Sequence, residues 1–475
     1  MKRTSLEYIV EGVKGRLYAR AEASEDGNRY DAVTSVSIDS RKIPDECLFF
    51  CIIGERADAH RFLPDVRAKG CHNVVVSDET WAEKMAAEGD MNVILVPDTR
   101  LALMALGEKY LDDWKGLRKI GVTGSVGKTS TKEFLYSVLS SRYRTGKTPG
   151  NLNSEFGIPL TAFSFEEDIE VAVIEMGAGY GSAIGDLAEI AKPETAVITN
   201  VGTSHLEVYG TREKLLEEKL RVSTGFTQAN TLVINTDSDI LTLDNAVKHQ
   251  PSDAHIVTVG SRGGEDYHIS EVEDRGIDGV RCSVTHGEET ATLELPVIGA
   301  HNLGNAVLAM AIGEVFGISL EEGAKALKHV ETNANRLSVI RTDQYTVIND
   351  TYNASPESMK AGIDVLCNSL GARRIAVLGS MFELGDHWEE LHQSVGAYAA
   401  SKNLDMLVAI GDNGRAIAEG AARAKDPDSI LAVLHFDDRE EAAKTIRPML
   451  TDGDIVYVKA SRSMELEKFV EAITE

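Results

Sequence analysis

The stretch that decides the fold reads Lys119-Ile-Gly-Val-Thr-Gly-Ser-Val-Gly-Lys-Thr-Ser-Thr-Lys-Glu133. Its apolar start predicts a strand, its glycines predict a loop, and a helical pattern begins at Lys128 and Thr129. Backbone N–H groups of such a loop and the positive end of the helix form a concave anion site. Lys128 adds a point charge and Thr129 a hydroxyl for Mg²⁺. The stretch therefore indicates a nucleotide triphosphate site, with a glycine turn that only caps a helix as the alternative.

The spacing of this phosphate loop is shorter than the commonest form, because Val122 stands where the first glycine is expected. In open α/β sheets, ligands bind outside the carboxyl ends of the strands, which is where this loop lies. The residues that we expect to bind ATP here are Gly124, Ser125, Val126, Gly127, Lys128, Thr129 and Ser130.

Length and composition limit the class of protein. The chain has 475 residues, which suggests about three domains, and its formal net charge of -26 opposes nucleic acid and anionic membranes. No apolar stretch approaches the ~20 residues of a bilayer span, and the first residues lack a signal-peptide core. We expect a cytoplasmic monomer without membrane insertion or nucleic-acid binding. Five cysteines without Cys-x-x-Cys spacing favour reduced, structural thiols.

The order of strand and helix patterns predicts an α/β protein with three domains. Residues 1–98 read as a small α/β domain, and residues 99–330 alternate strands and helices as a mostly parallel sheet requires. A junction is expected near residues 331–336, and residues 331–475 read as a second doubly wound, Rossmann-like sheet.

Charged or polar residues follow three further elements of the central section. Glu175 ends the apolar run Ile169 to Ile174, so it would face the phosphates, although a carboxylate that caps the next turn is the alternative. His205 follows the strand pattern Thr195 to Val201, and Lys219 lies on the helix that Thr211 can cap. Taken alone, the last two would be a loop histidine and a solvated helix charge.

The phosphate loop, the Glu175 strand, the turn Thr199-Asn-Val-Gly-Thr-Ser-His205 and the Lys219 helix together resemble the Mur ligases. These are ATP-dependent, amide-forming enzymes of peptidoglycan precursor synthesis, and folylpolyglutamate synthases share the same features. Segments 175–177, 350–356 and 377–385 resemble the branch of the family that adds D-alanyl-D-alanine to UDP-N-acetylmuramoyl-tripeptide. The resemblance runs through all three sections.

The resemblance implies roles for the residues around the nucleotide. Lys128 would contact the β- and γ-phosphates, Thr129 and Glu175 would hold one Mg²⁺, and His205 a second. Lys219 would be carbamylated by CO₂ and would help to position the second ion. The remaining nucleotide contacts would be Asn302 and Asn305 at the adenine, for which helix capping is the alternative, together with Arg336 and Asp350.

The substrate residues are expected in the outer sections and, for Asn153, in the central section. Ser40, Arg41 and Asn153 would contact the UDP-linked substrate, although Arg41 alone is better explained by a surface salt bridge. The candidates for the amine donor are Tyr352, Asn353, Lys459, Ser461 and Arg462, with ordinary strand-end polarity as the alternative for the last three.

The implied reaction activates the tripeptide carboxylate with ATP as an acyl phosphate, which the amine of D-alanyl-D-alanine then attacks. Two alternatives share this chemistry, a ligase that adds diaminopimelate or lysine and a folylpolyglutamate synthase. A nucleotide-dependent regulatory switch is the alternative from a different class.

Overall fold

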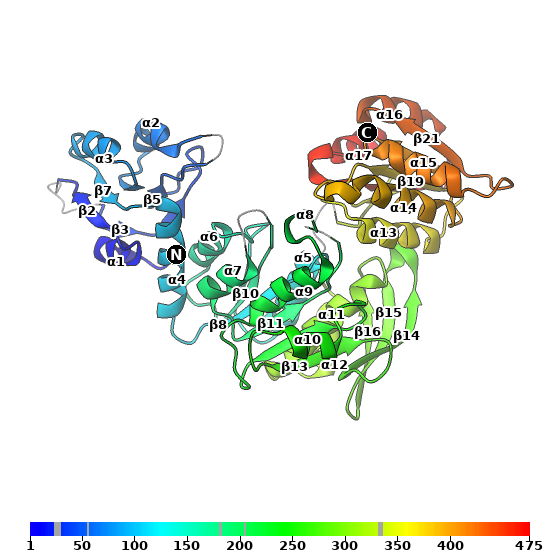
Figure 1. Cartoon of the computed structure of the whole chain (residues 1–475), viewed down its shortest axis with the longest axis horizontal. Helices are drawn as coiled ribbons and strands as arrows, with labels where there is room; N and C mark the ends of the chain where they lie inside the picture. Colours follow the sequence, from blue (N-terminus) through cyan, green and yellow to red (C-terminus); the bar gives the residue numbers. More distant parts are fainter. Residues whose placement is uncertain (23–29, 55–56, 180–182, 204–205, 331–335) are drawn as a thin grey trace.

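The computed structural model describes residues 1–22, 30–54, 57–179, 183–203, 206–330 and 336–475. Three larger sheets follow one another along the chain, and each is covered by helices. Figure 1 shows three bodies, with the N-terminal one at the left, the central one below, and the C-terminal one above it at the right. The α/β fold class with mostly parallel sheets is therefore confirmed.

The N-terminal sheet has the order β2-β7-β6-β5-β4, in which only the pairing of β2 with β7 is antiparallel. Its inner strands are buried on both faces, as expected for parallel strands between helices. The bounds are β1 Thr4–Ser5, β2 Arg16–Ala19, β3 Ala32–Val33, β4 Ser35–Ser37, β5 Cys47–Phe50, β6 Asn73–Val76, β7 Asn92–Leu95, α1 Leu6–Gly12, α2 Leu63–Ala68 and α3 Glu79–Ala86. The sequence did not predict β2, whose short, polar-flanked run lacks a clear alternation.

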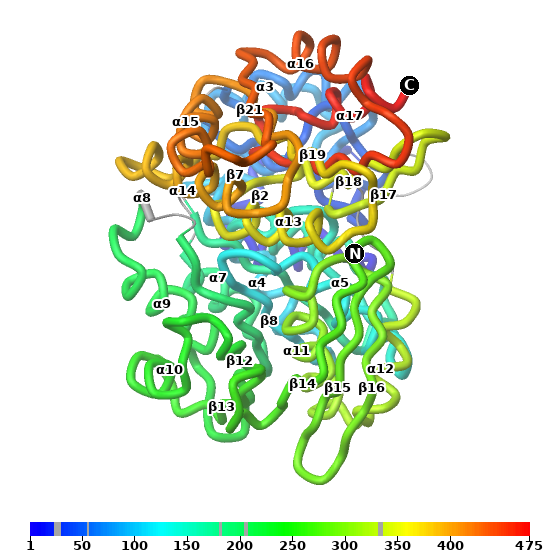
Figure 2. Tube along the Cα trace, turned by 90° about the vertical axis from the view of Figure 1, so that its right-hand side faces the viewer, coloured from blue at the N-terminus to red at the C-terminus, as the bar shows by residue number. Residues whose placement is uncertain are grey.

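The central sheet has nine strands in the order β16-β15-β14-β13-β12-β11-β8-β10-β9. Strands β8 to β14 run parallel, while β14, β15 and β16 form an antiparallel extension that projects at the lower edge of Figure 2. The strand bounds are β8 Arg118–Thr123, β9 Thr145–Lys147, β10 Val171–Glu175, β11 Thr195–Ile198, β12 Thr231–Asn235, β13 His255–Gly260, β14 Tyr267–Asp274, β15 Val280–His286 and β16 Glu289–Leu295. The helix bounds are α4 Thr99–Asp113, α5 Lys128–Ser140, α6 Gly157–Ser164, α7 Ile184–Ala191, α8 Leu206–Tyr209, α9 Arg212–Leu220, α10 Leu243–His249, α11 His301–Val315 and α12 Leu320–Leu327.

The C-terminal sheet has the order β17-β18-β22-β19-β20-β21, and only the edge strand β17 is antiparallel. The strand bounds are β17 Ser338–Arg341, β18 Thr346–Asn349, β19 Arg374–Gly379, β20 Met406–Ile410, β21 Ala432–Phe436 and β22 Ile455–Lys459. The helix bounds are α13 Pro356–Asn368, α14 Trp388–Ala400, α15 Gly414–Ala424, α16 Arg439–Ile446 and α17 Glu467–Thr474.

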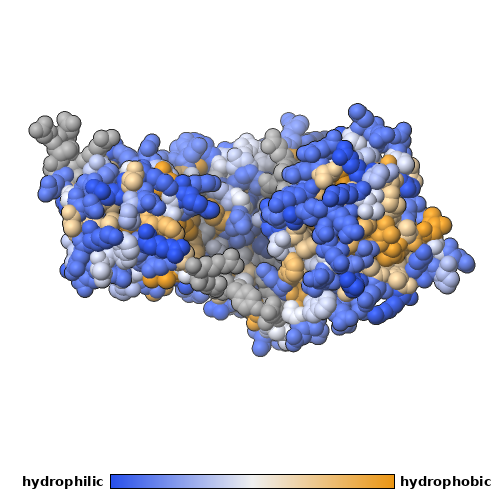
Figure 3. Space-filling model, turned by 90° about the horizontal axis from the view of Figure 1, so that it is seen from above, coloured by the Kyte–Doolittle hydropathy of each residue, from blue (hydrophilic) through white to orange (hydrophobic). Residues whose placement is uncertain are grey.

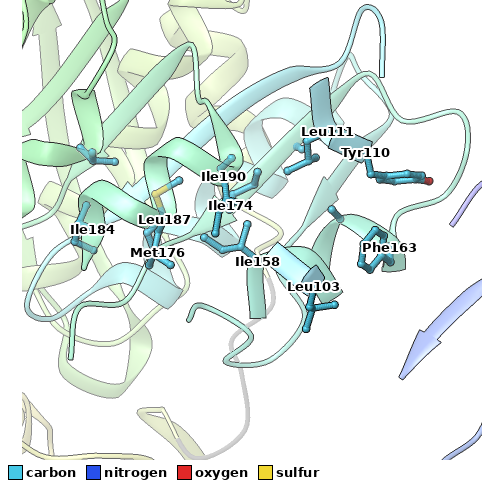
Figure 4. Packing of buried hydrophobic residues seen from close by; sticks show 14 of the residues in the cluster. Leu103, Tyr110, Leu111, Ile158, Phe163, Ile174, Met176, Ile184, Leu187 and Ile190 are labelled. Atoms are coloured by element: carbon cyan, nitrogen blue, oxygen red, sulfur yellow. The ribbon is translucent and has the colours of Figure 1, made fainter. Parts of the chain in front are cut away.

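Helix α4 joins the N-terminal and central bodies through a shared apolar core. Leu103 and Leu111 of α4 lie in the same buried cluster as Phe50 of the first sheet and Ile158 of α6. Figure 4 shows Ile158 beside Ile174 of β10, with Leu103 and Leu111 of α4 in the same group of apolar side chains. Burial of apolar surface stabilises such contacts by about 25 cal/mol per Å², so the first body is held firmly to the second.

The outer surface agrees with the composition. Most of the face in Figure 3 is hydrophilic, in keeping with the net charge of -26. Among the helices that the structure describes, none combines the length and apolarity of a bilayer span. All five cysteines are free thiols and four of them are buried, which confirms the prediction of reduced, structural cysteines.

Gly362 allows α13 to pack directly against Tyr457 of β22. A Cβ at this position would lie 1.9 Å from the Tyr457 hydroxyl oxygen. We therefore expect Gly362→Ala to lower the free energy of unfolding by about 1–3 kcal/mol, in spite of alanine's helix preference. Urea denaturation followed by circular dichroism measures the change.

The matched control is Gly323→Ala on α12, where the new Cβ would lie 3.4 Å from Met310. We expect this variant to be unchanged or stabilised by up to about 1 kcal/mol, because only the helix preference of alanine acts there. Equal stability of the two variants would contradict the packing argument.

Candidate active site

A cleft of about 1050 Å³ lies between the central and C-terminal bodies. The phosphate loop and the carboxyl ends of β10 and β11 supply one wall, and residues after β18 supply the other. Because β8 pairs in parallel register with both β10 and β11, the ends of all three strands meet at the same edge. The site therefore forms where the sequence analysis expected it.

The phosphate loop joins β8 to α5, as predicted. Gly127 caps α5 with a φ of 84°, a left-handed conformation that favours glycine. Backbone N–H groups of Ser125 and Val126 donate to the side-chain oxygen of Asn200 at 3.1 and 3.0 Å, which fixes the loop against the end of β11. The sequence analysis did not single out Asn200, although it lies in the 199–205 turn.

Lys128 folds back over its own loop. Its Nζ donates to the carbonyl oxygen of Gly124 at 2.8 Å and to that of Ser125 at 3.2 Å. Burial lowers the pKa of Lys128, an effect that nearby Glu175 opposes. A phosphate in the loop would supply the negative charge that this half-buried cation favours.

Thr129 and Glu175 lie in direct contact beside the loop. The Thr129 hydroxyl lies 3.1 Å from Glu175 Oε2, and the side-chain N–H of Asn153 donates to Oε1 at 2.8 Å. Because the Glu175 carboxylate contacts the side chains of Thr129 and Asn153, the turn-capping alternative does not describe it. A hydroxyl and a carboxylate side by side are the hard oxygen donors that Mg²⁺ prefers, and the two residues fit the predicted metal site.

Lys132 is a charged residue of this region that the sequence analysis missed. Its side chain is 1% exposed, and its Nζ lies 3.3 Å from Glu175 Oε2. In the sequence it looks like an ordinary solvated lysine in the second turn of a helix. Only the packing of α5 against β10 turns it inward.

Lys219 is buried on α9, with the side chain 1% exposed. The solvated-charge alternative is therefore wrong, because α9 packs this face inward. Burial, followed by the nearby charge of Lys128, lowers the pKa of Lys219 to about 7. A large fraction of the amine is thus neutral near pH 7. His205, the other residue predicted for the second metal ion, lies outside the described residues.

The two predicted adenine residues lie at the start of α11 and line the cleft. Asn302 donates from Nδ2 to the carbonyl oxygen of Ile298 at 2.8 Å, and Asn305 lies against the phosphate-loop residue Gly127. The N-cap of α11 is Ala300, without a side-chain cap, so the helix-capping alternative does not apply to either asparagine.

The C-terminal wall holds Arg336, Asp350, Tyr352, Asn353 and Lys459. The Arg336 guanidinium stacks 3.9 Å from the centre of the Tyr352 ring. Lys459 pairs with Asp350 at 2.5 Å, and the Tyr457 hydroxyl donates to the same carboxylate oxygen at 3.1 Å. Burial lowers the pKa of Lys459, an effect that Asp350 opposes.

Four predicted substrate residues lie outside the lining of this cleft. The backbone N–H of Phe382 donates to Ser461 Oγ at 3.0 Å, and Arg462 pairs with Glu467 at 2.7 Å. Arg41 is 86% exposed in its side chain and pairs with Asp39 at 2.8 Å, as the salt-bridge interpretation held. The backbone carbonyl of Ser40 accepts from Lys69. Asn153, by contrast, lies with Glu175 at the phosphate side. The substrate roles remain predictions for Ser40, Arg41, Asn153, Ser461 and Arg462.

Two known domain families match most of the part of the chain that forms the cleft. The Mur ligase middle domain matches residues 122–313, and the Mur ligase, glutamate ligase domain matches residues 335–462. These two ranges contain the phosphate loop, Glu175, Lys219 and the C-terminal wall.

Individual relatives match over nearly the whole chain. The UDP-N-acetylmuramoyl-tripeptide--D-alanyl-D-alanine ligase of Bacillus subtilis (strain 168) is 36% identical, covering 100% of this chain and 99% of the relative. The protein of the same name from Synechocystis sp. is 33% identical, covering 91% of this chain and 90% of the relative.

Solved structures agree with these matches. A crystal structure of MurF from Acinetobacter baumannii superimposes with a TM-score of 0.86 at 28% identity, covering 100% of this chain and 99% of that one. MurF ligase from Thermotoga maritima in complex with ADP gives 0.79 at 26% identity, covering 93% and 97%. The chain therefore belongs to the Mur ligase family of ATP-dependent ligases, and within it resembles the UDP-N-acetylmuramoyl-tripeptide--D-alanyl-D-alanine ligases.

Proposed function

We propose that this protein joins D-alanyl-D-alanine to UDP-N-acetylmuramoyl-tripeptide at the expense of ATP, releasing ADP and phosphate. The observation that carries the proposal is the 36% identity, over the full length of both chains, with the Bacillus subtilis ligase of that name. The cleft agrees with it, because the phosphate loop, the Thr129 hydroxyl and the Glu175 carboxylate line it, and the buried amine of Lys219 lies near Lys128 behind its wall. The reaction would serve peptidoglycan precursor synthesis, and hence cell-wall growth and division, in the cytoplasm.

Each body takes one substrate in this proposal. Residues 1–98 hold the UDP end of the acceptor with Ser40 and Arg41, residues 99–330 hold ATP, and residues 331–475 hold the dipeptide. Tyr352, Asn353 and Lys459 already face the cleft that contains the phosphate loop. The dipeptide amine would therefore approach the activated carboxylate from the C-terminal wall. Because one chain supplies all the residues of this site, the enzyme would act as a monomer.

The chain's own residues account for the transfer of the γ-phosphoryl group. The backbone N–H groups of the loop and Lys128 hold the phosphate oxygens and offset charge as the tripeptide carboxylate attacks. Two Mg²⁺ ions, held through Thr129, Glu175, His205 and modified Lys219, would neutralise the remaining phosphate charge. Arg336 and the two asparagines of α11 orient the nucleotide, and the walls of the cleft keep water from the acyl phosphate.

Burial of Lys219 favours the neutral amine that carbamylation needs. A neutral lysine amine attacks CO₂, forms an N–C bond and releases a proton, which leaves a carboxylate on a long side chain. The lowered pKa of about 7 makes the neutral amine available near pH 7. The negative charge so formed would also compensate the neighbouring Lys128, whose positive charge now disfavours a second cation there.

The reaction itself is the first test. With ATP and Mg²⁺, we expect release of ADP only when UDP-N-acetylmuramoyl-tripeptide and D-alanyl-D-alanine are both present, because each completes one half of the cleft. Mass spectrometry should find the two joined with loss of water. A panel of amine donors, including diaminopimelate, lysine and glutamate, separates the related ligases. Rapid ATP turnover without either substrate would contradict the proposal.

Replacement of Lys219 by alanine tests the carbamate. We expect Lys219→Ala to reduce kcat by about 10²-fold or more, because a buried group that stabilises charge in the transition state is lost. Added acetate or formate should restore part of the rate by occupying the space of the carbamate. The control is Lys214→Ala on the exposed face of α9, which should keep the wild-type rate. A Lys219→Ala enzyme of normal activity would rule out the role.

The pH dependence of carbamylation follows from the pKa of Lys219. Below about 7 the amine is protonated and unreactive, so the carbamate should increase as the pH rises through that value. With ¹³C-bicarbonate and constant dissolved CO₂, a carbamate signal should therefore grow in the ¹³C NMR spectrum of the wild-type protein and be missing from Lys219→Ala. A signal that does not change with pH would show that burial does not control the amine.

A further inference from the structure

Lys132 makes contacts that the proposed reaction does not yet use. It lies on α5 one turn beyond Lys128 and does not line the cleft. Its Nζ lies 3.3 Å from Glu175 Oε2 and donates to the carbonyl oxygen of Gly150 at 3.1 Å. A third contact is with Glu133 at 3.8 Å, and Glu133 in turn pairs with Lys147. One buried cation therefore joins the end of β10 to the segment that follows β9.

The segment 148–153, which we call the 148–153 loop, is held to the end of β10 by further bonds. The backbone N–H of Glu175 donates to the Thr148 hydroxyl at 2.9 Å, and the N–H of Gly177 donates to the carbonyl of Asn153 at 2.8 Å. The side chains of Asn151 and Asn153 face the cleft. The loop thus reaches the cleft at its far end, while Lys132 holds its middle from behind.

We propose that Lys132 is a positioning residue that fixes the 148–153 loop and the Glu175 carboxylate relative to each other. Without it, each partner would lose a charge-assisted contact inside the protein, where such contacts are strongest. The inference rests on the proposed function in one respect: we assign the 148–153 loop to the UDP-linked acceptor substrate. Lys132 would then couple the nucleotide side of the cleft to its acceptor side without touching either ligand.

A purely local role for Lys132 predicts something different. If it served only to neutralise Glu175, its contact with Gly150 would be incidental, and the 148–153 loop would be unaffected by its loss. A cation that fixes the loop must instead change the exchange of the loop's backbone amides. The Thr148, Leu152 and Asn153 amides all donate backbone hydrogen bonds, so hydrogen exchange can report on them.

The first experiment uses the free protein and hydrogen–deuterium exchange measured by mass spectrometry. In Lys132→Met, which keeps the chain length but removes the charge, we expect exchange in peptides covering 148–156 to be faster by about tenfold or more. The matched control is Lys119→Met, which removes another buried lysine, on β8 and away from the cleft lining. It should leave exchange at 148–156 unchanged.

The second experiment measures substrate use, after the wild-type enzyme has been found to make the product. We expect Lys132→Met to raise KM for UDP-N-acetylmuramoyl-tripeptide by about tenfold, with a smaller effect on KM for ATP. Asn153→Ala should raise the same KM, and the double variant should be less impaired than the product of the two effects, because both act through one loop.

The outcomes separate the two proposals. A wild-type enzyme that makes no product would refute the proposed function and leave the exchange experiment valid. A folded Lys132→Met protein with wild-type hydrogen exchange at 148–156 would overturn the role of Lys132. The same conclusion would follow if the increase in KM of the double variant equalled the product of the increases caused by Lys132→Met and Asn153→Ala. Should Lys132→Met fail to fold, Lys132→Gln, which keeps a donor but no charge, is read by the same criteria.

Discussion

The parallel register of β8 with β10 and β11 is the constraint on which the site depends. It places Glu175 opposite Val122 and Ile198 opposite Thr123, so that three strands end together at one edge of the central sheet. The strand register alone therefore brings the phosphate loop, the Glu175 carboxylate and the 199–202 turn together. A slip of one residue in β10 would turn Glu175 to the other face of the sheet and remove it from Thr129.

Charge distribution is the second organising feature. The chain carries a net charge of -26, yet lysines gather at the cleft. Half-buried Lys128 and buried Lys459 lie in its walls, and buried Lys132 and Lys219 lie behind them. Each buried ammonium costs free energy unless an anion lies close by. Glu175 and Asp350 supply such anions for Lys132 and Lys459. Lys128 and Lys219 have no comparable ion pair with a carboxylate among the described residues, and the proposed function assigns a phosphate to Lys128 and carbamylation to Lys219.

Local patterns in the sequence predicted the fold class, the phosphate loop and the strand that carries Glu175. They succeeded there because the structure of a glycine loop or of a buried strand follows from residues that are neighbours in the sequence. Lys132 could not be recognised in this way, since only the packing of α5 against β10 distinguishes it from a solvated lysine. The antiparallel strands β14 to β16 were missed for a related reason: β-strand direction depends on pairing partners, and not on the strand's own residues. Ser461 and Arg462 were placed in the site by resemblance, whereas their side chains bond within the C-terminal body.

The central and C-terminal bodies meet through hydrogen bonds and an apolar contact, in which Ile298 and Ile277 of the central section pack in the core cluster of the C-terminal body. Thr203 donates to Glu357 at 2.7 Å on one side of the interface, and Asn368 donates to Asp274 at 2.9 Å on the other. Hydrogen bonds of this type contribute only about 1 kcal/mol each, whereas α4 buries a continuous apolar cluster against the N-terminal body. An interface that binds weakly can open and close within a catalytic cycle. In the proposed assignment, the acceptor and ATP sites lie on the two bodies that share the large apolar cluster at α4, while the amine donor binds the wall that is joined to the rest by few apolar residues. This arrangement suits a reaction in which the amine must enter after the carboxylate is activated.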